Sequence, residues 1–463
     1  RERVMWQAVV ERFEQQAPAS VMARLALEQA LPAQWVDEVF AQHRRRQYPR
    51  ELMFSTIVEL MTLVTLGLRP SLHAAARKLD KLPVSLAALY DKLRRTEPAI
   101  LRALVCGSAQ RLAPVASQFS APSSLPGWQL RIVDGNHLPA SQKRLQPLRG
   151  HRGAALPGHS LVVYDPDLAL VCDSVACEDA HESERVGVQP LVDSARPGQL
   201  WIADRHFCTH AIVHGFERAG AAFVVREHAC HPRLIEQGPW SQGLRTPTGS
   251  VREQSIRVQG IHDDAGGVPA WRRIEIELDT ATEAGETVIA LWSNLPAAIA
   301  AATIAALYRK RWRIEGMFQR LESVLHSEIR SLGHPRAALL GFTVAVLAYN
   351  VLSLLQRAVE QAHREEHPRL EVSTYHLAEH VKSGYEGMLI AAPAECWCGL
   401  AAQAEPSLAE RLLRLARRIL PKQVATSKRG PKLDKPKGYV DASIARSHVS
   451  TARVLAQARR ARP

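Results

Sequence analysis

The sequence predicts an α/β protein in which an all-helical N-terminal region precedes a sheet-containing domain and a helical C-terminal region. Apolar residues recur at helical spacing through residues 1–120. Short apolar runs typical of strands begin after a linker at 121–127, and helical patterns return at about residue 297. The length of 463 residues, with 46% hydrophobic and 23% charged residues, is typical of a soluble globular protein of about two to four domains.

The N-terminal region contains two well-marked helices, one that ends at Pro70 and one over residues 71–79. The apolar face of the first consists of Met53, Ile57, Leu60, Met61 and Val64. A basic cluster, His43-Arg44-Arg45-Arg46 with Arg50 behind it, precedes them. This cluster indicates either a DNA-binding helical domain or a solvated helix end.

Beyond the linker the pattern alternates between strands and one helix. We expect a helix over 208–218 and strands over 129–133, 159–164, 169–175, 199–203 and 222–226. Residues 228–291 are turn-rich with alternating stretches such as 273–278, which predicts a β-rich insertion. A long helix is expected over 297–331, and helices continue to Pro421.

The excess of positive charge lies at the C-terminus. Residues 411–463 contain fifteen Lys or Arg and two acidic residues, which leaves 44 basic and 44 acidic residues in 1–410. Such a tail suits a polyanion, and its alternative is a solvated, partly disordered end. The seven scattered cysteines fit a reducing intracellular compartment. Residues 337–355 carry no charge and reach transmembrane length, but their polar residues favour a buried core helix.

Two of the expected strands end at an aspartate, Asp134 in IVDG and Asp204 in IADR. A carboxylate at the end of a strand is rigidly held and accessible to a ligand, although Asp is also a common turn residue. On the long helix, Tyr308, Arg311 and Glu315 stand at i, i+3 and i+7, within roughly 60° of one another. Their basic neighbours are Lys310, Arg313 and Arg320. This face suits a phosphate backbone near a metal, or is a solvated face with salt bridges.

Taken together and in order, these features resemble a known family. Asp134 in VDGNHL, Asp204 in WIADRHF, the segment LWSNLP at 291–296 and Tyr308-x2-Arg311-x3-Glu315 are similar to the DDE transposases of bacterial insertion sequences. The IS-four family, which includes the Tn-five transposase, is the closest group. The resemblance spans roughly residues 40–350.

The resemblance implies an RNase H-like catalytic domain with a β-rich insertion between the second Asp and the Glu. The expected layout is then a helical, DNA-binding domain (1–120), the catalytic domain (121–227 and 292–356), the insertion (228–291), a helical region (357–420) and a basic tail (421–463).

The resemblance also implies the roles of individual residues. Asp134, Asp204 and Glu315 would hold two Mg²⁺ ions, with Mn²⁺ as a substitute, since hard cations choose carboxylate oxygens. Tyr308 and Arg311 would hold the DNA backbone. Apart from the resemblance, the sequence offers Lys310, Arg313, Arg320 and Trp292 as further DNA-binding candidates. The Trp292 ring could stack on a displaced base, but packing in the core is the favoured alternative.

The expected function is cut-and-paste transposition, in which metal-dependent cleavage at transposon ends is followed by strand transfer into target DNA. The expected partner is double-stranded DNA bound by a homodimer, without a membrane, in the bacterial cytoplasm at the nucleoid. One departure keeps an alternative open, because Glu322 stands where the family has Lys. The alternatives are a catalytically inactive DNA-binding protein descended from a transposase and an RNase H-like nuclease without strand transfer.

Overall fold

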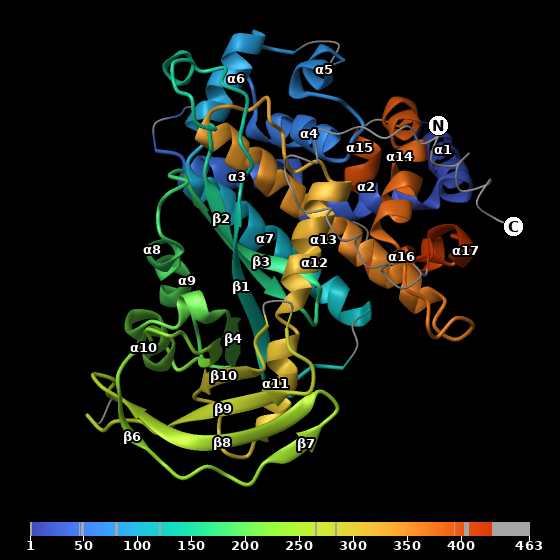
Figure 1. Cartoon of the computed structure of the whole chain (residues 1–463). Helices are drawn as coiled ribbons and strands as arrows, with labels where there is room; N and C mark the ends of the chain where they lie inside the picture. Colours follow the sequence, from blue (N-terminus) through green and yellow to red (C-terminus); the bar gives the residue numbers. More distant parts are fainter. Residues whose placement is uncertain are drawn as a thin grey trace, which may run out of the picture. The chain divides into compact units, whose positions relative to one another are not determined.

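The computed structural model of the chain describes residues 2–45, 47, 51–78, 82–119, 122–263, 266–282, 285–392, 394–401 and 407–427 (Figure 1). Residues 1–425 form one compact unit and residues 426–463 a second. Arg46 and Arg50 of the basic cluster, and the predicted tail from residue 428 onward, lie outside the described residues. The predicted domain boundaries within the first unit stay predictions.

The N-terminal region is helical, as predicted. Its helices are α1 (Glu2–Gln16), α2 (Pro18–Ala30), α3 (Ala33–His43), α4 (Phe54–Thr65), α5 (Leu72–Arg77), α6 (Leu86–Arg95) and α7 (Pro98–Ala116), followed by the short η1 (Ser117–Phe119). The Ser71 side chain caps α5 by accepting a hydrogen bond from the Ala74 N–H, which satisfies one of the free donors at a helix start. The apolar faces of these helices share one core with α13 and one face of the sheet.

A mixed sheet occupies the middle of the first unit. Its first strands are β1 (Gln129–His137), β2 (His159–Asp165), β3 (Leu170–Cys177), β4 (Gln199–Ala203) and β5 (Ala222–Arg226). The spatial order is β3-β2-β1-β4-β5, with β1, β4 and β5 parallel and β2 antiparallel to both its neighbours. Strand β1 is longer than predicted, so that Asp134 lies within the strand and pairs with Val162 of β2.

The turn-rich region after β5 is β-structured, as predicted, but it continues the same sheet. Its strands are β6 (Leu234–Gln237), β7 (Leu244–Thr246), β8 (Gly249–Val258), β9 (Trp271–Leu278) and β10 (Val288–Ser293). Strand β10 pairs with both β5 and β9, which joins these strands to the first five in one ten-stranded sheet. Figure 1 shows β8 and β9 crossing below α10 and α11.

The two faces of the first five strands pack against different helices. One face contacts α8 (Glu184–Gly187), α9 (Gln189–Asp193) and α10 (His210–Arg218) through residues such as Val133 and Trp201. The other face, with Ile132 and Ile202, belongs to the main core. Side chains alternate between the faces of a strand, so Asp134 and Asp204 extend from the same face as Ile132 and Ile202. The predicted carboxylates thus share one face of neighbouring parallel strands.

The single long helix predicted over 297–331 is two helices. They are α11 (Ala301–Arg309) and α12 (Trp312–Val324). The N–H groups of Lys310, Arg311, Arg313 and Ile314 each bond the carbonyl three residues earlier, a tighter turn than the α-helical spacing of four. The predicted helix is therefore interrupted between Tyr308 and Glu315, but the chain does not turn back on itself there.

The remaining helices are α13 (Pro335–Ala362), α14 (Thr374–Ala391), α15 (Ala394–Ala401), α16 (Leu408–Ala416) and the short α17 (Pro421–Val424). Among the described helices, α13 alone is long and apolar enough to cross a membrane, and its most apolar window is 100% buried inside the protein. The prediction of a buried core helix is confirmed. Asn350 of α13 holds edge strand β3, because its amide bonds both the N–H and the carbonyl of Val171 at 2.8 Å.

Candidate catalytic site

The candidate site is organised around one buried arginine. Arg311, whose side chain is 11% exposed, lies at the junction between α11 and α12. Its guanidinium donates to Oδ2 of Asp134 at 3.0 Å and to Oε1 of Glu315 at 2.9 Å. One cation thus bridges a carboxylate of the sheet and a carboxylate of the helix that are far apart in the sequence.

Asp204 belongs to the same electrostatic cluster. It follows β4, next to β1 in the sheet, and caps the short η3 (Arg205–Phe207) by accepting a hydrogen bond from the His206 N–H at 2.7 Å. Burial raises the pKa of Asp134 to about 6, the Arg311 charge acts to lower it, and the Asp204 carboxylate raises it further. The positive charge of Arg311 is therefore too small to keep the pKa of Asp134 at its ordinary value of 3.8.

Tyr308 is buried next to Arg311. The ring is 5% exposed, and burial raises the pKa of its hydroxyl to about 12 while Arg311, within hydrogen-bonding reach, acts to lower it. The predicted shared face of Tyr308, Arg311 and Glu315 thus exists despite the helix break. The buried phenol faces Arg311, so a direct contact of Tyr308 with DNA stays a prediction.

The donor set fits a divalent cation in its chemistry. Carboxylate oxygens are the preferred ligands of Mg²⁺ and Mn²⁺, and Asp134, Asp204 and Glu315 supply them beside a position that already holds a cationic group. As arranged here, however, no group of three or more His, Cys, Asp or Glu among the described residues is positioned to hold a metal ion. Arg311 fills the space between two of the carboxylates, so metal binding requires its guanidinium to move.

Three residues predicted to bind DNA are directed elsewhere. Trp292 is fully buried in β10 and donates its indole N–H to Glu227 at 2.7 Å, so the predicted base stacking is wrong for this arrangement. Lys310 donates to the Ser124 hydroxyl, and Arg313 donates to the Pro166 carbonyl at 3.1 Å. Both cations fasten the helix junction to the turn between β2 and β3 and to the linker before β1.

Arg320 and Glu322 are exposed on α12. Arg320 lies near Tyr164: burial raises the pKa of the Tyr164 hydroxyl, and the Arg320 charge acts to lower it. Its predicted contact with DNA is compatible with this exposure and stays a prediction. His206, His210 and His214 follow Asp204 at intervals of four residues, a spacing that on one helix could suggest a metal site. His206 instead lies in η3, before α10, and the described residues contain no metal-ligand cluster.

Glu184 is a charged neighbour of Asp134 that the sequence reasoning did not single out. It begins α8, and its carboxylate is one of the charges that raise the pKa of Asp134. A Ser-Glu pair at a helix start is a common pattern, so only the fold brings Glu184 to Asp134.

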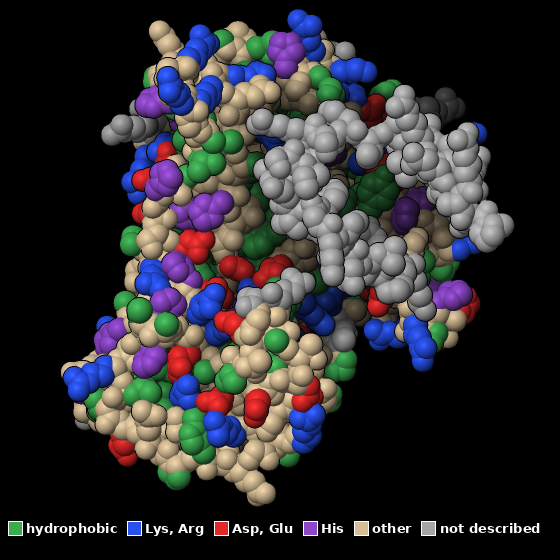
Figure 2. Space-filling view, in the orientation of Figure 1, with side chains coloured by type: hydrophobic (Ala, Val, Ile, Leu, Met, Phe, Trp, Pro, Cys, Tyr) green, Lys and Arg blue, Asp and Glu red, His purple; other side chains and the backbone are tan. Residues whose placement is uncertain are grey.

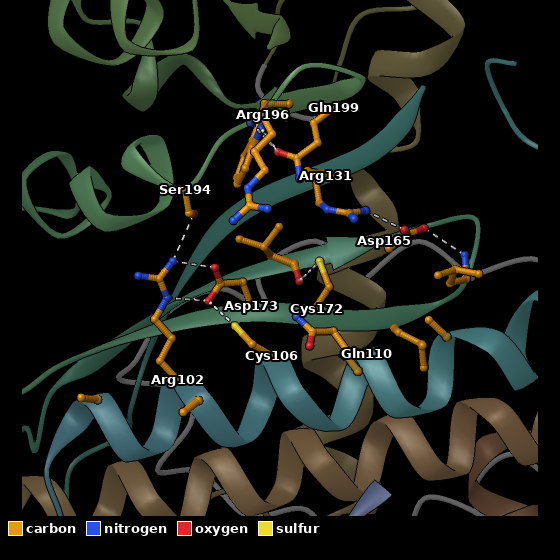
Figure 3. Close-up of a pocket in the computed structure, with 18 of the residues that line it drawn as sticks. Arg102, Cys106, Gln110, Arg131, Asp165, Cys172, Asp173, Ser194, Arg196 and Gln199 are labelled. Atoms are coloured by element: carbon orange, nitrogen blue, oxygen red, sulfur yellow. Dashed lines mark hydrogen bonds and ion pairs between the residues drawn. The ribbon is translucent and has the colours of Figure 1, made fainter. Parts of the chain in front are cut away.

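A cavity of about 550 Å³ lies away from these carboxylates, between α7 and the sheet (Figure 3). Arg102 crosses it and binds both oxygens of Asp173 at 2.8 and 2.7 Å, and Arg131 pairs with Asp165 at 2.7 Å. Arg131 and Asp134 are three residues apart on β1, so their side chains leave opposite faces of the sheet. The cavity is therefore separate from the candidate site.

Comparison with known families gives one match. Residues 127–351 match the family model described as the transposase DDE domain, whereas no curated protein matches the chain. The chain therefore contains a transposase DDE domain, which begins just before β1 and ends within α13. This domain implies an enzyme of the nuclease and transposase class with DNA as its substrate, and DDE transposases generally use divalent metal ions.

Proposed function

We propose that this protein is a DNA transposase that cleaves transposon ends and transfers them into target DNA, with Asp134, Asp204 and Glu315 as its catalytic carboxylates. The observation that supports this most is the bridging of Asp134 and Glu315 by Arg311, next to Asp204, inside the DDE domain. The proposal includes membership in the IS-four family and a homodimer on DNA in the bacterial cytoplasm.

The proposed fold of the catalytic part is RNase H-like. Its support is the mixed strand order β3-β2-β1-β4-β5, with two neighbouring parallel strands that each carry an aspartate and a helix that brings the glutamate beside β1. The strands β6 to β9 then form the insertion between the second Asp and the Glu.

The chain's own residues perform three tasks in this proposal. Asp134, Asp204 and Glu315 hold Mg²⁺ or Mn²⁺, and two such ions would activate the attacking hydroxyl and stabilise the leaving oxygen. Tyr308 and the junction between α11 and α12 orient Arg311. Arg311, once released from its carboxylates, offers a planar pair of donors that matches a backbone phosphate.

The test is a cleavage assay on DNA that carries the segments flanking the coding sequence, with Mg²⁺ or Mn²⁺. Asp134→Ala and Glu315→Ala should abolish cleavage while a gel shift still shows DNA binding. Asp193→Ala, which removes an exposed acid of α9, is the matched control and should cleave normally. Loss of binding in step with cleavage in the two site variants would contradict the proposed roles.

Two outcomes separate the alternatives. Cleavage without joining of precut ends to a plasmid would indicate a nuclease. Metal-independent DNA binding without any cleavage would favour an inactive, transposase-derived DNA-binding protein, an alternative that the exposed Glu322 keeps open.

A further inference from the structure

The connection between β1 and β2 carries an excess of positive charge. Strand β1, which contains Asp134, ends at His137 and β2 begins at His159, so residues 138–158 form this connection, the β1–β2 loop. Its sequence, LPASQKRLQPLRGHRGAALPG, contains one Lys, three Arg and no acidic residue. Its one helical segment is the short η2 (Gln146–Leu148). Connections longer than about 12–15 residues with so little regular structure are usually functional when they are ordered.

The β1–β2 loop has a fixed place on the protein. At its base the Leu138 N–H donates to the Gly158 carbonyl at 3.0 Å, which continues the pairing of β1 with β2. Further along, the Gln142 N–H donates to the Arg330 carbonyl at 2.9 Å, which fastens the loop to the connection between α12 and α13. The loop is therefore anchored to the strand and to the helix that carry two of the proposed catalytic carboxylates.

Three arginines of the loop face solvent with most of their donors unused. Arg144, Arg149 and Arg152 are exposed, and none of them forms an ion pair with another described residue. The Arg144 Nε donates to the Gln142 side chain at 2.8 Å, and Arg149 donates to the Arg144 carbonyl at 3.3 Å. Each of the three thus uses at most one nitrogen atom of its guanidinium within the part of the chain that the structure describes.

The arginines next to the anchoring segment differ in this respect. Arg330 lies 3.8 Å from the Glu328 carboxylate, and Arg336 donates to Glu178 at 2.9 Å. Their charges are compensated by acids, whereas those of the β1–β2 loop are not. Figure 2 shows Lys and Arg side chains gathered at the upper left of the molecule, where Figure 1 shows this loop.

The position of the loop favours DNA as the partner of these arginines. Leu138 follows Asp134 by four residues, about 13 Å along an extended strand, a separation comparable to about four base pairs of B-DNA. A duplex with one phosphate at Asp134 is therefore within reach of the loop, and the planar guanidinium fork matches phosphate oxygens. Resting on the proposed function, we propose that the β1–β2 loop binds the DNA backbone beside the catalytic carboxylates through Arg144, Arg149 and Arg152.

The experiment measures binding of the full chain to a fluorescently labelled duplex that carries the segments flanking the coding sequence. Anisotropy is followed at several salt concentrations with a chelator present. Replacement of the three arginines by alanine should weaken binding about tenfold or more at low salt. It should also reduce the slope of log affinity against log salt concentration by about 3, because each phosphate contact contributes about 0.9. An unrelated duplex should show the same loss, since phosphate contacts carry no sequence information.

Two matched variants separate a local contact from an effect of net charge. The first removes the same charge at exposed positions elsewhere and should change the slope by less than about 1; its three arginines, replaced by alanine, are Arg218, Arg233 and Arg369. The second replaces the three loop arginines by lysine, which keeps the charge but not the paired donors, and should keep the slope with intermediate affinity. Thermal unfolding verifies that each variant is folded.

The outcomes distinguish this proposal from the proposed function. Unchanged affinity and slope in the alanine variant of the loop, while Asp134→Ala abolishes cleavage, would overturn the role of the loop and leave the proposed function intact. An equal loss in the variant with distant replacements would also overturn it. A changed oligomeric state with unchanged DNA affinity would assign the loop to a protein partner instead. Wild-type protein that neither binds nor cleaves DNA would overturn both proposals.

Discussion

Replacement of Asp134 by asparagine is expected to stabilise the metal-free protein at neutral pH. The Asp134 side chain is 22% exposed, and burial raises its pKa from 3.8 to about 6 although Arg311 acts to lower it. A carboxyl group with a higher pKa in the folded than in the unfolded state costs stability when it ionises. The shift corresponds to about 3 kcal/mol of folding stability that is lost when Asp134 ionises, and a neutral asparagine avoids this loss.

The sign of this effect gives it a distinctive pH dependence. Below about pH 3 the carboxyl group is protonated in both states, so the wild type and Asp134→Asn should differ little in free energy of unfolding. As the pH rises from about 4 to 6, the unfolded chain ionises first, and the wild type loses the contribution of Asp134. The advantage of the variant should therefore grow to at most about 3 kcal/mol at pH 6 and then stay constant.

The assay is urea unfolding of both proteins with a chelator at several pH values from 4 to 7, so that effects shared by the two proteins cancel at each pH. Asp193→Asn, at an exposed position of α9, should show no such trend. Addition of Mn²⁺ should stabilise the wild type more than Asp134→Asn, because a ligand stabilises the state that binds it. A variant that is less stable at pH 7, or equally shifted at every pH, would mean that Asp134 serves chiefly as a structural partner of Arg311.

Three further predictions follow from individual contacts. Asn350→Ala leaves the buried N–H and carbonyl of Val171 without partners and should cost about 2–4 kcal/mol in urea unfolding, whereas an unchanged midpoint would contradict the role of Asn350. Trp292→Phe removes the bond to Glu227 and should cost about 1–2 kcal/mol with no change in DNA affinity; weaker binding in a gel shift by a folded variant would restore the stacking role. Glu322→Lys should strengthen DNA binding and steepen its salt dependence, with Glu322→Gln intermediate, and equal affinities of the three proteins would place Glu322 away from DNA.

The strands were the most predictable part of the fold. The predicted runs 199–203 and 222–226 coincide with β4 and β5, because both are short apolar runs buried on both faces between polar residues. The length of β1 was not predictable in the same way. Its last residues, Asp134 to His137, are largely polar, yet they stay in the strand because β2 supplies backbone partners as far as His159. Backbone pairing carries no signature in the side chains of one strand.

The candidate site was predictable where it depends on local spacing and unpredictable where it depends on packing. The spacing of Tyr308, Arg311 and Glu315 predicted that they lie together, and Arg311 contacts both of the others although the helix breaks there. Glu184 was missed because its relation to Asp134 depends on helices α8 and α9 covering the sheet. For Trp292 the sequence left base stacking and core packing open, and the pairing of β10 with two other strands buries the ring.

Two arginine–aspartate pairs of this protein show why hydrogen-bond saturation, more than pairing itself, separates structure from function. Asp173 accepts bonds from Arg102, from the Cys106 thiol and from the Ser174 N–H, so its oxygens are fully used in joining α7 to β3. Among the described residues, Asp134 accepts bonds only from Arg311 and from the N–H of its neighbour Gly135, and burial raises its pKa by more than the Arg311 charge lowers it. A carboxylate saturated by protein donors has little to offer a ligand, whereas one that is desolvated and underbonded gains from a second cation. The arrangement at Asp134 is costly for a purely structural ion pair, and this cost is understandable if the site is shaped to bind a metal.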